Sequence, residues 1–474
     1  MEPTRASQLA RLAGARVLGD PDALVGPDVV IDSRAATPGS LFVALPGERV
    51  DGHDFAAAAV AAGAAAVLCS RPVNVSVPQL IAADAATALA DLATGIVGGA
   101  IAAGLVSVGV TGSSGKTSTK DLMAQVLAAA GPTVAPPGSA NNEIGVPLTA
   151  CRVEASTRFL VSELGARGRG HIAWLCGIVH PSVGAVLNVG HAHLGEFGSV
   201  DAIAEAKGEL VEALPETGWV VLNADDARVA AMANRTHARI ARFSTVGDPG
   251  PGELRVWADD VTADPFQRAA FRLHAEGAQA GTAGVTLRVS GGHQVANALA
   301  AAAVGLSQGM SVEAVAEALS RATSRSRWRM ELAERPDGLL VVNDAYNANP
   351  DSMAAALRAV AAMRRDGGRL VAVLADMLEL GPDAPAAHRT VGEIAATLGF
   401  DQVVVLGQFA DDIAAGAHKG VARIDRVADR AEAVRVVATY AAGQDVVLVK
   451  ASRGLALETV AEQLGAEPVT EVRR

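Results

Sequence analysis

The sequence predicts an α/β protein of three domains with mostly parallel sheets. At roughly 100–200 residues per domain, a chain of 474 residues exceeds a single core. Short apolar runs also alternate with helical patterns along most of its length. Hydrophobic residues make up 50% of the chain but aromatic residues only 3%, and small aliphatic side chains suit helices packed closely on parallel sheets. We place the domains at residues 1–98, 99–324 and 325–474.

The first 98 residues alternate short strands with Ala-rich helices, which predicts a small α/β domain. Residues 41–45 have the apolar run of a strand, and residues 55–62 have the pattern of a helix. Arg34 and His53 stand in polar segments nearby. From the sequence alone, these two residues fit a solvated loop as well as they fit a functional site.

An uncharged stretch at residues 92–115 is long enough to cross a lipid bilayer. Its residues are mostly Gly, Ala and Ser. We therefore predict a linker followed by a buried strand, and no membrane span. The N-terminus also lacks the apolar segment of a signal peptide.

The most informative stretch is residues 106–117, Val-Ser-Val-Gly-Val-Thr-Gly-Ser-Ser-Gly-Lys-Thr. It predicts a strand, a tight loop and a helix N-terminus. Backbone N–H groups of such a loop converge on an anion, and the helix dipole adds partial positive charge. Lys116 would reach the outer phosphates of ATP, and the Thr117 hydroxyl would help to hold Mg²⁺. Val110 stands where the strict pattern has glycine, so the motif is a variant.

An ordinary glycine-rich turn is the alternative interpretation of this stretch, but the flanking strand and helix argue against it. We therefore predict that the central domain is a P-loop-type ATPase α/β domain that binds ATP and Mg²⁺. The predicted phosphate-binding residues are Thr111, Gly112, Ser113, Ser114, Gly115, Lys116, Thr117 and Ser118.

Two further segments of the central domain favour a metal site. Residues 158–163 predict a strand that ends on Glu163, and an acid at the carboxyl end of a strand beside a phosphate loop commonly binds Mg²⁺. A capping carboxylate is the alternative role. His191 and His193 follow another predicted strand, at residues 183–189. Zinc is not expected because no Cys or second His pair completes a tetrahedral site, but one histidine could be an outer Mg²⁺ ligand.

The rest of the central domain is less distinctive. A helix is predicted at residues 202–214, and from the residues alone its Lys207 is best interpreted as a surface lysine. Residues 248–292 are short, polar and broken by glycines, which predicts a small antiparallel patch. An Ala-rich helix then begins near residue 291.

The last 150 residues predict a C-terminal Rossmann-like α/β domain, because strands alternate with helices. No Gly-x-Gly-x-x-Gly follows the first strand, so a nicotinamide cofactor is not indicated. Polar loops follow three strands, at residues 343–350, 376–381 and 450–454, where open α/β sheets bind ligands. The predicted strands are residues 339–343, 370–374, 402–406 and 445–450, and helices begin near Ser352, Ala387, Asp411 and Ala431.

Charge and cysteine content restrict the partners. A net charge of −11 argues against nucleic-acid binding, so an anionic substrate must be met by local Lys and Arg clusters. One such cluster lies at residues 324–329. The three cysteines, Cys69, Cys151 and Cys176, have no paired spacing, which is typical of a reduced, cytoplasmic protein. We expect a monomer.

With these segments assembled, the chain resembles the Mur ligase family over nearly its whole length. The Asn141 and Asn343 segments favour the member that joins a UDP-N-acetylmuramoyl-tripeptide to D-alanyl-D-alanine. The matching segments are Asp-Ser-Arg at 32–34, Asp-Gly-His-Asp-Phe at 51–55, the phosphate loop, Asn-Asn-Glu-Ile-Gly-Val-Pro-Leu at 141–148, Ala-His-Leu-Gly-Glu-Phe-Gly-Ser at 192–199, Ala-Lys-Gly-Glu at 206–209, Asn-Asp-Ala-Tyr-Asn-Ala-Asn-Pro at 343–350 and Ser-Arg-Gly at 452–454.

The resemblance implies roles for particular residues. His193 would serve a second Mg²⁺, and Lys207 would be carbamylated into an anionic metal bridge, which replaces the surface interpretation of this lysine. The N-terminal domain would bind the uridine nucleotide. The remaining implied roles are Ser33 and Arg34 near the uridine nucleotide, Asn141 and Asn142 at the substrate, Asn297, Arg329 and Asp344 at ATP, and Tyr346, Asn347 and Asn349 in the pocket for the incoming dipeptide.

The implied reaction is amide formation through an acyl phosphate, with Lys116, Lys207 and His193 as catalytic residues. No base for the incoming amine can be identified from the sequence. The sequence departs from the family pattern at Ser114, at Ser118 and in the Glu-Leu-Gly-Ala-Arg-Gly-Arg-Gly segment at 163–170. The alternatives are a sibling ligase that adds a diamino acid, a folylpolyglutamate-type ligase, and a nucleotide-switched regulator that forms no amide.

Overall fold

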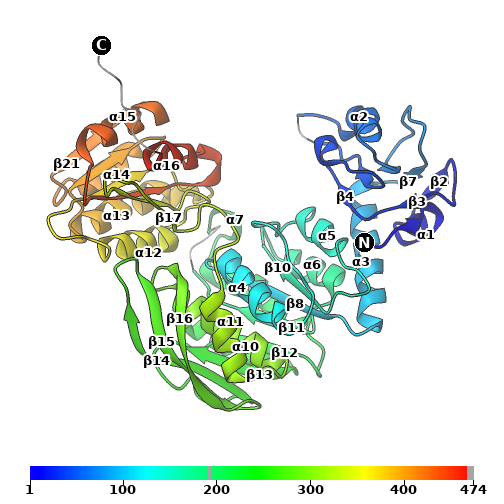
Figure 1. The fold of residues 1–474 in the computed structure, drawn as a ribbon, viewed down its shortest axis with the longest axis horizontal. Helices are drawn as coiled ribbons and strands as arrows, with labels where there is room; N and C mark the ends of the chain where they lie inside the picture. Colours follow the sequence, from blue (N-terminus) through cyan, green and yellow to red (C-terminus); the bar gives the residue numbers. More distant parts are fainter. Residues whose placement is uncertain (48, 191–193, 467–474) are drawn as a thin grey trace.

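A computed structural model describes residues 1–47, 49–190 and 194–466. The chain folds into three lobes, each built on its own mainly parallel sheet (Figure 1). The α/β architecture predicted from the sequence is therefore confirmed. The sheets lie within residues 16–81, 106–290 and 331–450, so the predicted boundaries at 98/99 and 324/325 fall between them.

The N-terminal lobe contains a five-stranded sheet in the order β2-β7-β6-β5-β4. Helix α2 (Ala56–Ala61) and strand β5 (Leu41–Val43) lie where the sequence predicts them. The other elements are β1 (Thr4–Arg5), α1 (Ala6–Leu12), β2 (Arg16–Leu18), β3 (Leu24–Val25), β4 (Val29–Val30), η1 (Ser33–Ala35), η2 (Gly52–Phe55), β6 (Ala66–Cys69) and β7 (Gln79–Ile81).

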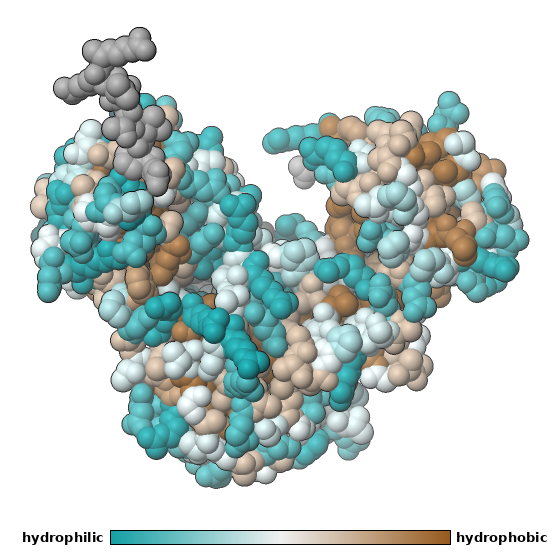
Figure 2. Space-filling model, in the orientation of Figure 1, coloured by the Kyte–Doolittle hydropathy of each residue, from teal (hydrophilic) through white to brown (hydrophobic). Residues whose placement is uncertain are grey.

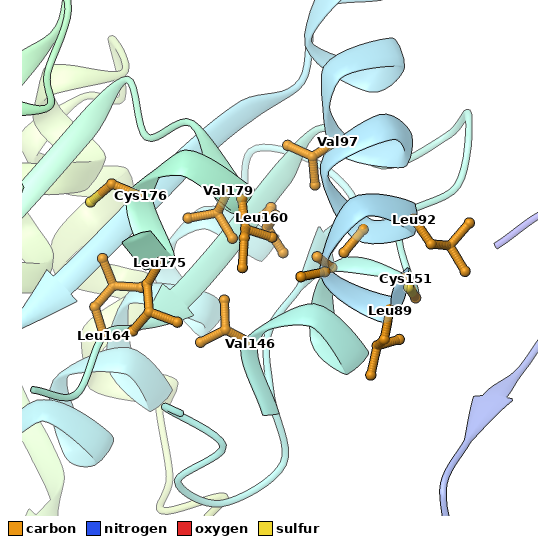
Figure 3. Close-up of a cluster of buried hydrophobic side chains, with 14 of the residues drawn as sticks. Leu89, Leu92, Val97, Val146, Cys151, Leu160, Leu164, Leu175, Cys176 and Val179 are labelled. Carbon is orange, nitrogen blue, oxygen red and sulfur yellow. The ribbon is translucent and has the colours of Figure 1, made fainter. Parts of the chain in front are cut away.

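A single long helix, α3 (Ala85–Ala102), joins the N-terminal and central lobes. The linker that we predicted at the start of residues 92–115 is therefore wrong, because Ala has high helix propensity and Asp84 caps the helix by accepting from Thr87 N. In the described part of the chain, α3 is the one helix with the length and composition of a membrane span. Its Leu89, Leu92 and Val97 instead belong to a buried hydrophobic cluster that also contains residues of both lobes (Figure 3).

The central lobe is built on a nine-stranded sheet in the order β16-β15-β14-β13-β12-β11-β8-β10-β9. Neighbouring strands from β9 through β14 in this order pair in parallel, while β15 pairs antiparallel with β14 and with β16, which extends the same sheet. The antiparallel prediction for residues 248–292 is confirmed, but the strands form an edge of the main sheet. The strands are β8 (Val106–Thr111), β9 (Thr133–Val134), β10 (Phe159–Glu163), β11 (Val183–Val186), β12 (Trp219–Asn223), β13 (Arg239–Ser244), β14 (Leu254–Ala263), β15 (Arg268–Gly277) and β16 (Gly281–Ser290).

Helices cover both faces of this sheet, as a mainly parallel sheet requires. They are α4 (Lys116–Ala128), α5 (Gly145–Ala150), α6 (His171–Val179), α7 (Leu194–Phe197), α8 (Val200–Glu212), α9 (Ala227–Ala231), η3 (Met232–Arg235), α10 (Gln294–Ser307) and α11 (Val312–Arg321).

The C-terminal lobe has a six-stranded sheet in the order β17-β18-β22-β19-β20-β21, parallel except for the edge strand β17. All four strands predicted from the sequence are present. The elements are β17 (Glu331–Glu334), β18 (Leu340–Asn343), α12 (Pro350–Ala361), β19 (Leu370–Leu374), η4 (Gly381–Asp383), α13 (Ala384–Thr397), β20 (Gln402–Val405), α14 (Ala410–Ala417), β21 (Arg423–Arg426), α15 (Arg430–Tyr440), β22 (Val446–Lys450), η5 (Arg453–Leu455) and α16 (Glu458–Gly465).

Helix α4, which begins at the phosphate loop, also holds the connection to the C-terminal lobe. Lys120 Nζ lies 2.5 Å from Asp121 Oδ1, and both side chains are almost fully buried. Asp121 Oδ2 accepts a hydrogen bond from Ser326 N at 2.8 Å. One turn further, Gln125 donates to Thr323 O at 2.8 Å and accepts from Thr323 N at 3.1 Å. The connecting segment is therefore fastened along two turns of α4.

We predict that Asp121→Ala lowers the free energy of unfolding by about 3–5 kcal/mol, because it leaves the Lys120 ammonium buried without its counter-charge. Urea denaturation followed by circular dichroism measures this change. Asp411→Ala is the matched control, since Asp411 is 87% exposed and pairs with Arg426 on the surface. The control should change stability by less than about 0.5 kcal/mol. Equal effects of the two substitutions would show that the buried pair does not hold this connection.

Candidate active site

A cavity of about 550 Å³ lies where the phosphate loop faces the C-terminal lobe. Figure 2 shows a broad hollow between the upper lobes, above the central one. The cavity is lined by Ser113–Ser118 of the phosphate loop, the end of β10, and the polar loops that follow β18, β19 and β22. The sequence predicted ligand-binding loops at these strand ends, and the structure brings them together.

The phosphate loop has the predicted strand–loop–helix form. Gly115 precedes α4 with a left-handed φ of +80°, a conformation that glycine adopts without steric cost. A Cβ on Gly115 would lie 2.7 Å from Asn297 Oδ1, so the loop rests directly on α10. Asn297 Oδ1 also accepts from Thr119 Oγ1 at 3.0 Å. The close contact between loop and helix thus requires glycine at this position.

Lys116 bends back over the loop, and its Nζ donates to Gly112 O at 2.7 Å. Burial lowers the pKa of the Lys116 amine, an effect that nearby Glu163 opposes and Arg329 reinforces. An anion placed here would interact strongly with the amine, since little water screens it. Thr111 lies deeper: its hydroxyl donates to Leu164 O at 2.9 Å, so it joins β8 to β10 and does not line the cavity.

Glu163, at the end of β10, is buried and held from one side only. Its Oε1 accepts from Ser139 Oγ at 2.6 Å and from Asn141 Nδ2 at 2.7 Å. Its Oε2 is buried and has no hydrogen-bond partner in the described part of the chain. A carboxylate oxygen buried without a partner is costly unless a cation meets it. Together with the nearby Thr117 hydroxyl, this oxygen fits Mg²⁺, a cation that prefers oxygen ligands.

Lys207 lies on α8 and is 5% exposed, so its interpretation as a surface lysine is wrong. Burial, reinforced by repulsion from Lys116, lowers the pKa of the Lys207 amine well below its usual value. The described residues contain no group of three or more His, Cys, Asp and Glu side chains arranged for a metal. His191 and His193, both considered as metal ligands, lie outside the described residues.

Residues from both sides of the lobe connection meet at the cavity. Arg329 donates to Thr117 Oγ1 at 3.1 Å, and its guanidinium lies 4.2 Å from the centre of the Tyr346 ring. Asp344 accepts from Met330 N at 3.1 Å and from Lys450 Nζ at 2.6 Å. Lys450, which the sequence analysis did not single out, is fully buried. Lys450 is the last residue of β22, a strand that is otherwise apolar. A lysine in this position was the sequence signal that could have identified it.

Several predicted binding residues also shape the backbone. Asn349 caps α12 by accepting from Ser352 N at 2.8 Å, and Asn142 Oδ1 accepts from Gly145 N at 2.9 Å. Asn347 Oδ1 accepts from Ala348 N at 2.9 Å. Asn188, which the sequence analysis missed, accepts from Ser114 N at 2.9 Å and steadies the phosphate loop. All four line the cavity, so their amide groups remain within reach of a ligand.

Ser33 and Arg34 lie in the N-terminal lobe and do not line the cavity. Arg34 is exposed and forms a double hydrogen bond with the carboxylate of Asp32. Through these bonds Arg34 lowers the pKa of Asp32 to about 2. The lobe that carries these residues stands apart from the C-terminal lobe (Figure 1). A substrate that reaches both must therefore span the hollow.

Comparison with known proteins matches three family descriptions along the chain. Residues 28–109 match "Mur ligase family, catalytic domain", residues 110–305 match "Mur ligase middle domain", and residues 328–453 match "Mur ligase, glutamate ligase domain". The UDP-N-acetylmuramoyl-tripeptide–D-alanyl-D-alanine ligase of Mycobacterium tuberculosis is 47% identical, over 97% of each chain. The chain belongs to the Mur ligase family.

Two solved Mur ligase structures share this architecture. One is the UDP-N-acetylmuramoylalanyl-D-glutamyl-2,6-diaminopimelate–D-alanyl-D-alanyl ligase of Acinetobacter baumannii, which is 31% identical over 98% of each chain with a TM-score of 0.82. The other is MurF of Thermotoga maritima in complex with ADP, 29% identical over 92% of this chain and 97% of that chain, with a TM-score of 0.77. The three-lobed arrangement is therefore the one seen in this Mur ligase's relatives.

We predict that Gly115→Ala weakens ADP binding at least ~10-fold in this Mur ligase, since a left-handed conformation costs a residue with a Cβ about 1–2 kcal/mol and the new methyl group would press on Asn297. Isothermal titration calorimetry measures the dissociation constant. Gly98→Ala in α3 is the matched control, because its added Cβ would have no atom within 4 Å. Unchanged ADP affinity in Gly115→Ala would refute the requirement for glycine.

Proposed function

We propose that this chain is an ATP-dependent, ADP-forming ligase that joins UDP-N-acetylmuramoyl-tripeptide to D-alanyl-D-alanine in peptidoglycan precursor synthesis. The observation that carries the proposal is the 47% identity, over 97% of both chains, to a ligase of that name. The cavity geometry supports it independently, because a nucleotide loop faces polar loops from a second lobe. The enzyme would work in the cytoplasm.

The chemistry follows from the weakness of a carboxylate as an electrophile. The γ-phosphoryl group of ATP is transferred to the terminal carboxylate of the tripeptide, which gives an acyl phosphate and ADP. The amine of the dipeptide then attacks the acyl carbon, phosphate leaves, and one proton is released. Both steps concentrate negative charge, and the buried amine of Lys116 together with the loop amides stabilises it.

A divalent cation fits this site, and bound Mg²⁺ would supply further charge stabilisation on the phosphates. We assign Thr117 and Glu163 to hold Mg²⁺, His193 to serve a second Mg²⁺, and carbamylated Lys207 to supply an anionic metal ligand. Glu163 offers its unpartnered Oε2. Lys207 would contribute as a carbamate: its neutral amine adds to CO₂ and loses one proton, which converts a buried amine into an anion. The lowered pKa of Lys207 favours the neutral amine that this addition requires.

The remaining roles follow the lobes. Asn297, Arg329 and Asp344 would contact the nucleotide, with Ser113–Ser118 around its phosphates. Tyr346, Asn347 and Asn349 would shape the pocket for the dipeptide, and Asn141 and Asn142 would face the donor. Ser33 and Arg34 would bind the uridine nucleotide in the N-terminal lobe. Water exclusion by the assembled lobes would protect the acyl phosphate from hydrolysis.

The decisive test is mass spectrometry of a reaction that contains ATP, Mg²⁺, the UDP-linked tripeptide and D-alanyl-D-alanine. We expect a UDP-linked pentapeptide, with oxygen-18 from the donor carboxylate appearing in the released phosphate. A product formed only with a diamino acid and the UDP-linked dipeptide would instead identify the sibling ligase. ATP hydrolysis without any amide product would identify a nucleotide-switched regulator.

We predict that Lys207→Ala lowers kcat at least ~100-fold, because a metal-bridging anion is lost, and that added acetate or formate partly restores it by supplying a carboxylate. Activity of the unsubstituted enzyme should fall as pH falls, since protonation of the amine prevents carbamate formation. Carbon-13 NMR in labelled bicarbonate should show a carbamate signal that Lys207→Ala lacks.

Lys419→Ala, which removes an exposed lysine, is the matched control and should retain full activity. Full activity in Lys207→Ala would refute the assignment of a carbamate to Lys207. The same carbamate signal in Lys207→Ala and Lys419→Ala would also refute it.

A further inference from the structure

The loop that connects β10 to α6, residues 164–170, carries two arginines with different surroundings. Arg169 forms an ion pair with Glu205 of α8. Arg167 lines the cavity, is exposed, and forms no ion pair with any residue that the structure describes. In this loop the sequence also departs from the residue pattern expected for the Mur ligase family. An arginine at this place is therefore a property of this chain that the proposed chemistry has not used.

The loop is fixed at its base, so Arg167 is presented from a defined position. Its backbone N donates to His171 Nδ1 at 3.2 Å. Glu209 accepts from Gly170 N at 2.6 Å and from Ala173 N at 3.0 Å, which occupies the first N–H groups of α6. The anion-binding capacity of that helix end is thus already satisfied by Glu209. The Arg167 guanidinium remains as the local positive charge that faces the cavity.

His171 lies beside Arg167 and lines the same part of the cavity. Its Nδ1 accepts a hydrogen bond from the backbone N of Arg167. Its Nε2 is buried and faces the carboxylate of Glu143, whose Oε1 lies 3.0 Å away. His171 is therefore occupied within the chain, and the Arg167 guanidinium is the group that would meet a carboxylate.

The other cations of the cavity have partners. Lys450 is bonded to Asp344, and Arg453 to Glu458 at 2.5 Å. Arg329 is bonded to Thr117 and lies over Tyr346. Lys116 is bonded to the carbonyl oxygen of Gly112. Of the cavity cations that the structure describes, Arg167 is the one that its own chain leaves without an acceptor.

We propose that Arg167 binds a carboxylate of the donor peptide other than the one that ATP activates. The proposal rests on the proposed function. A planar guanidinium binds a carboxylate through two parallel hydrogen bonds, which gives both affinity and orientation. The donor named for the Acinetobacter relative, alanyl-D-glutamyl-2,6-diaminopimelate, has carboxylates beyond the one that is joined.

Position supports this assignment. The activated carboxylate must lie near Lys116 and Glu163, and Arg167 stands four residues beyond Glu163 on the loop that leaves β10. Helices α5 and α6 border the N-terminal lobe (Figure 1), so this side of the cavity faces the lobe proposed to hold the uridine nucleotide. A donor peptide that runs from that lobe to the phosphate loop passes Arg167 before its reacting end.

Steady-state kinetics with Arg167→Ala tests the proposal. We expect the KM for the UDP-linked tripeptide to rise at least ~10-fold, because the variant loses one charged hydrogen-bonded pair with this substrate. The KM values for ATP and for D-alanyl-D-alanine, and the kcat, should stay within about twofold of those of the unsubstituted enzyme. Arg169→Ala is the matched control and should leave all four parameters unchanged. A rise in the KM for ATP with none for the tripeptide would overturn the assignment.

Donors in which each non-reacting carboxylate is in turn replaced by a carboxamide identify the group that Arg167 binds. For the unsubstituted enzyme, one of these donors should have a KM at least ~10-fold above that of the native donor, and Arg167→Ala should reduce this ratio to about 1. A ratio that Arg167→Ala leaves unchanged for every donor would overturn the proposal. If the unsubstituted enzyme makes no pentapeptide from the native donor, the proposed function itself fails; if it does and Arg167 has no effect, only this inference fails.

Discussion

The buried ion pair between Lys120 and Asp121 is the interaction on which the arrangement of the site depends. It lies one turn beyond Lys116, on the helix that carries the phosphate loop. Asp121 uses its second oxygen to fix the backbone of Ser326, three residues before Arg329. The position of the nucleotide loop and the origin of the C-terminal lobe are thus set by the same two turns of helix. Arg329 can reach Thr117 because Asp121 of α4 holds the segment that leads to Arg329, and Thr117 lies on the same helix.

Desolvated amines define the electrostatics of the cavity. Burial lowers the pKa of Lys116, Lys207 and Lys450, although the chain as a whole carries a net charge of −11. The acids in their surroundings compensate only in part, since Glu163 keeps one oxygen without a partner among the described residues. A site with buried amines and a partly unpaired carboxylate is costly when empty and suits phosphates that arrive with a cation. The buried amines and the Glu163 carboxylate are therefore already in place to bind an ionic substrate.

Most of the architecture could be predicted from the sequence because its signals are local. Parallel strands are continuous apolar runs, and the phosphate loop has a fixed spacing of glycines before Lys116. Strand β21 (Arg423–Arg426) was missed because its polar residues lie at the edge of the sheet, where burial does not select apolar side chains. The start of residues 92–115 was assigned to a linker because glycines within it conceal a helical pattern that tertiary packing stabilises.

The site was predicted less completely than the fold, for a physical reason. Motifs identify residues that touch phosphate, but they do not show which side chains are desolvated. Lys207 looked like a surface residue until α8 was seen to bury it, and Lys450 and Asn188 were missed because their partners, Asp344 and Ser114, are distant in the sequence. In the sequence Arg167 was visible only as a departure from a pattern, because its lack of an ion pair among the described residues depends on the three-dimensional structure.

Helix α3 has a mechanical consequence. It is an uninterrupted rod of about 27 Å at 1.5 Å per residue, and its side chains belong to the cores of two lobes at once. The N-terminal lobe is thus connected to the central lobe by one continuous helix, and this helix packs against α5 and α6. A movement of the N-terminal lobe together with α3 would change how α3 packs on these two helices. Since α6 begins directly after the loop that carries Arg167, such a movement would also reach that loop.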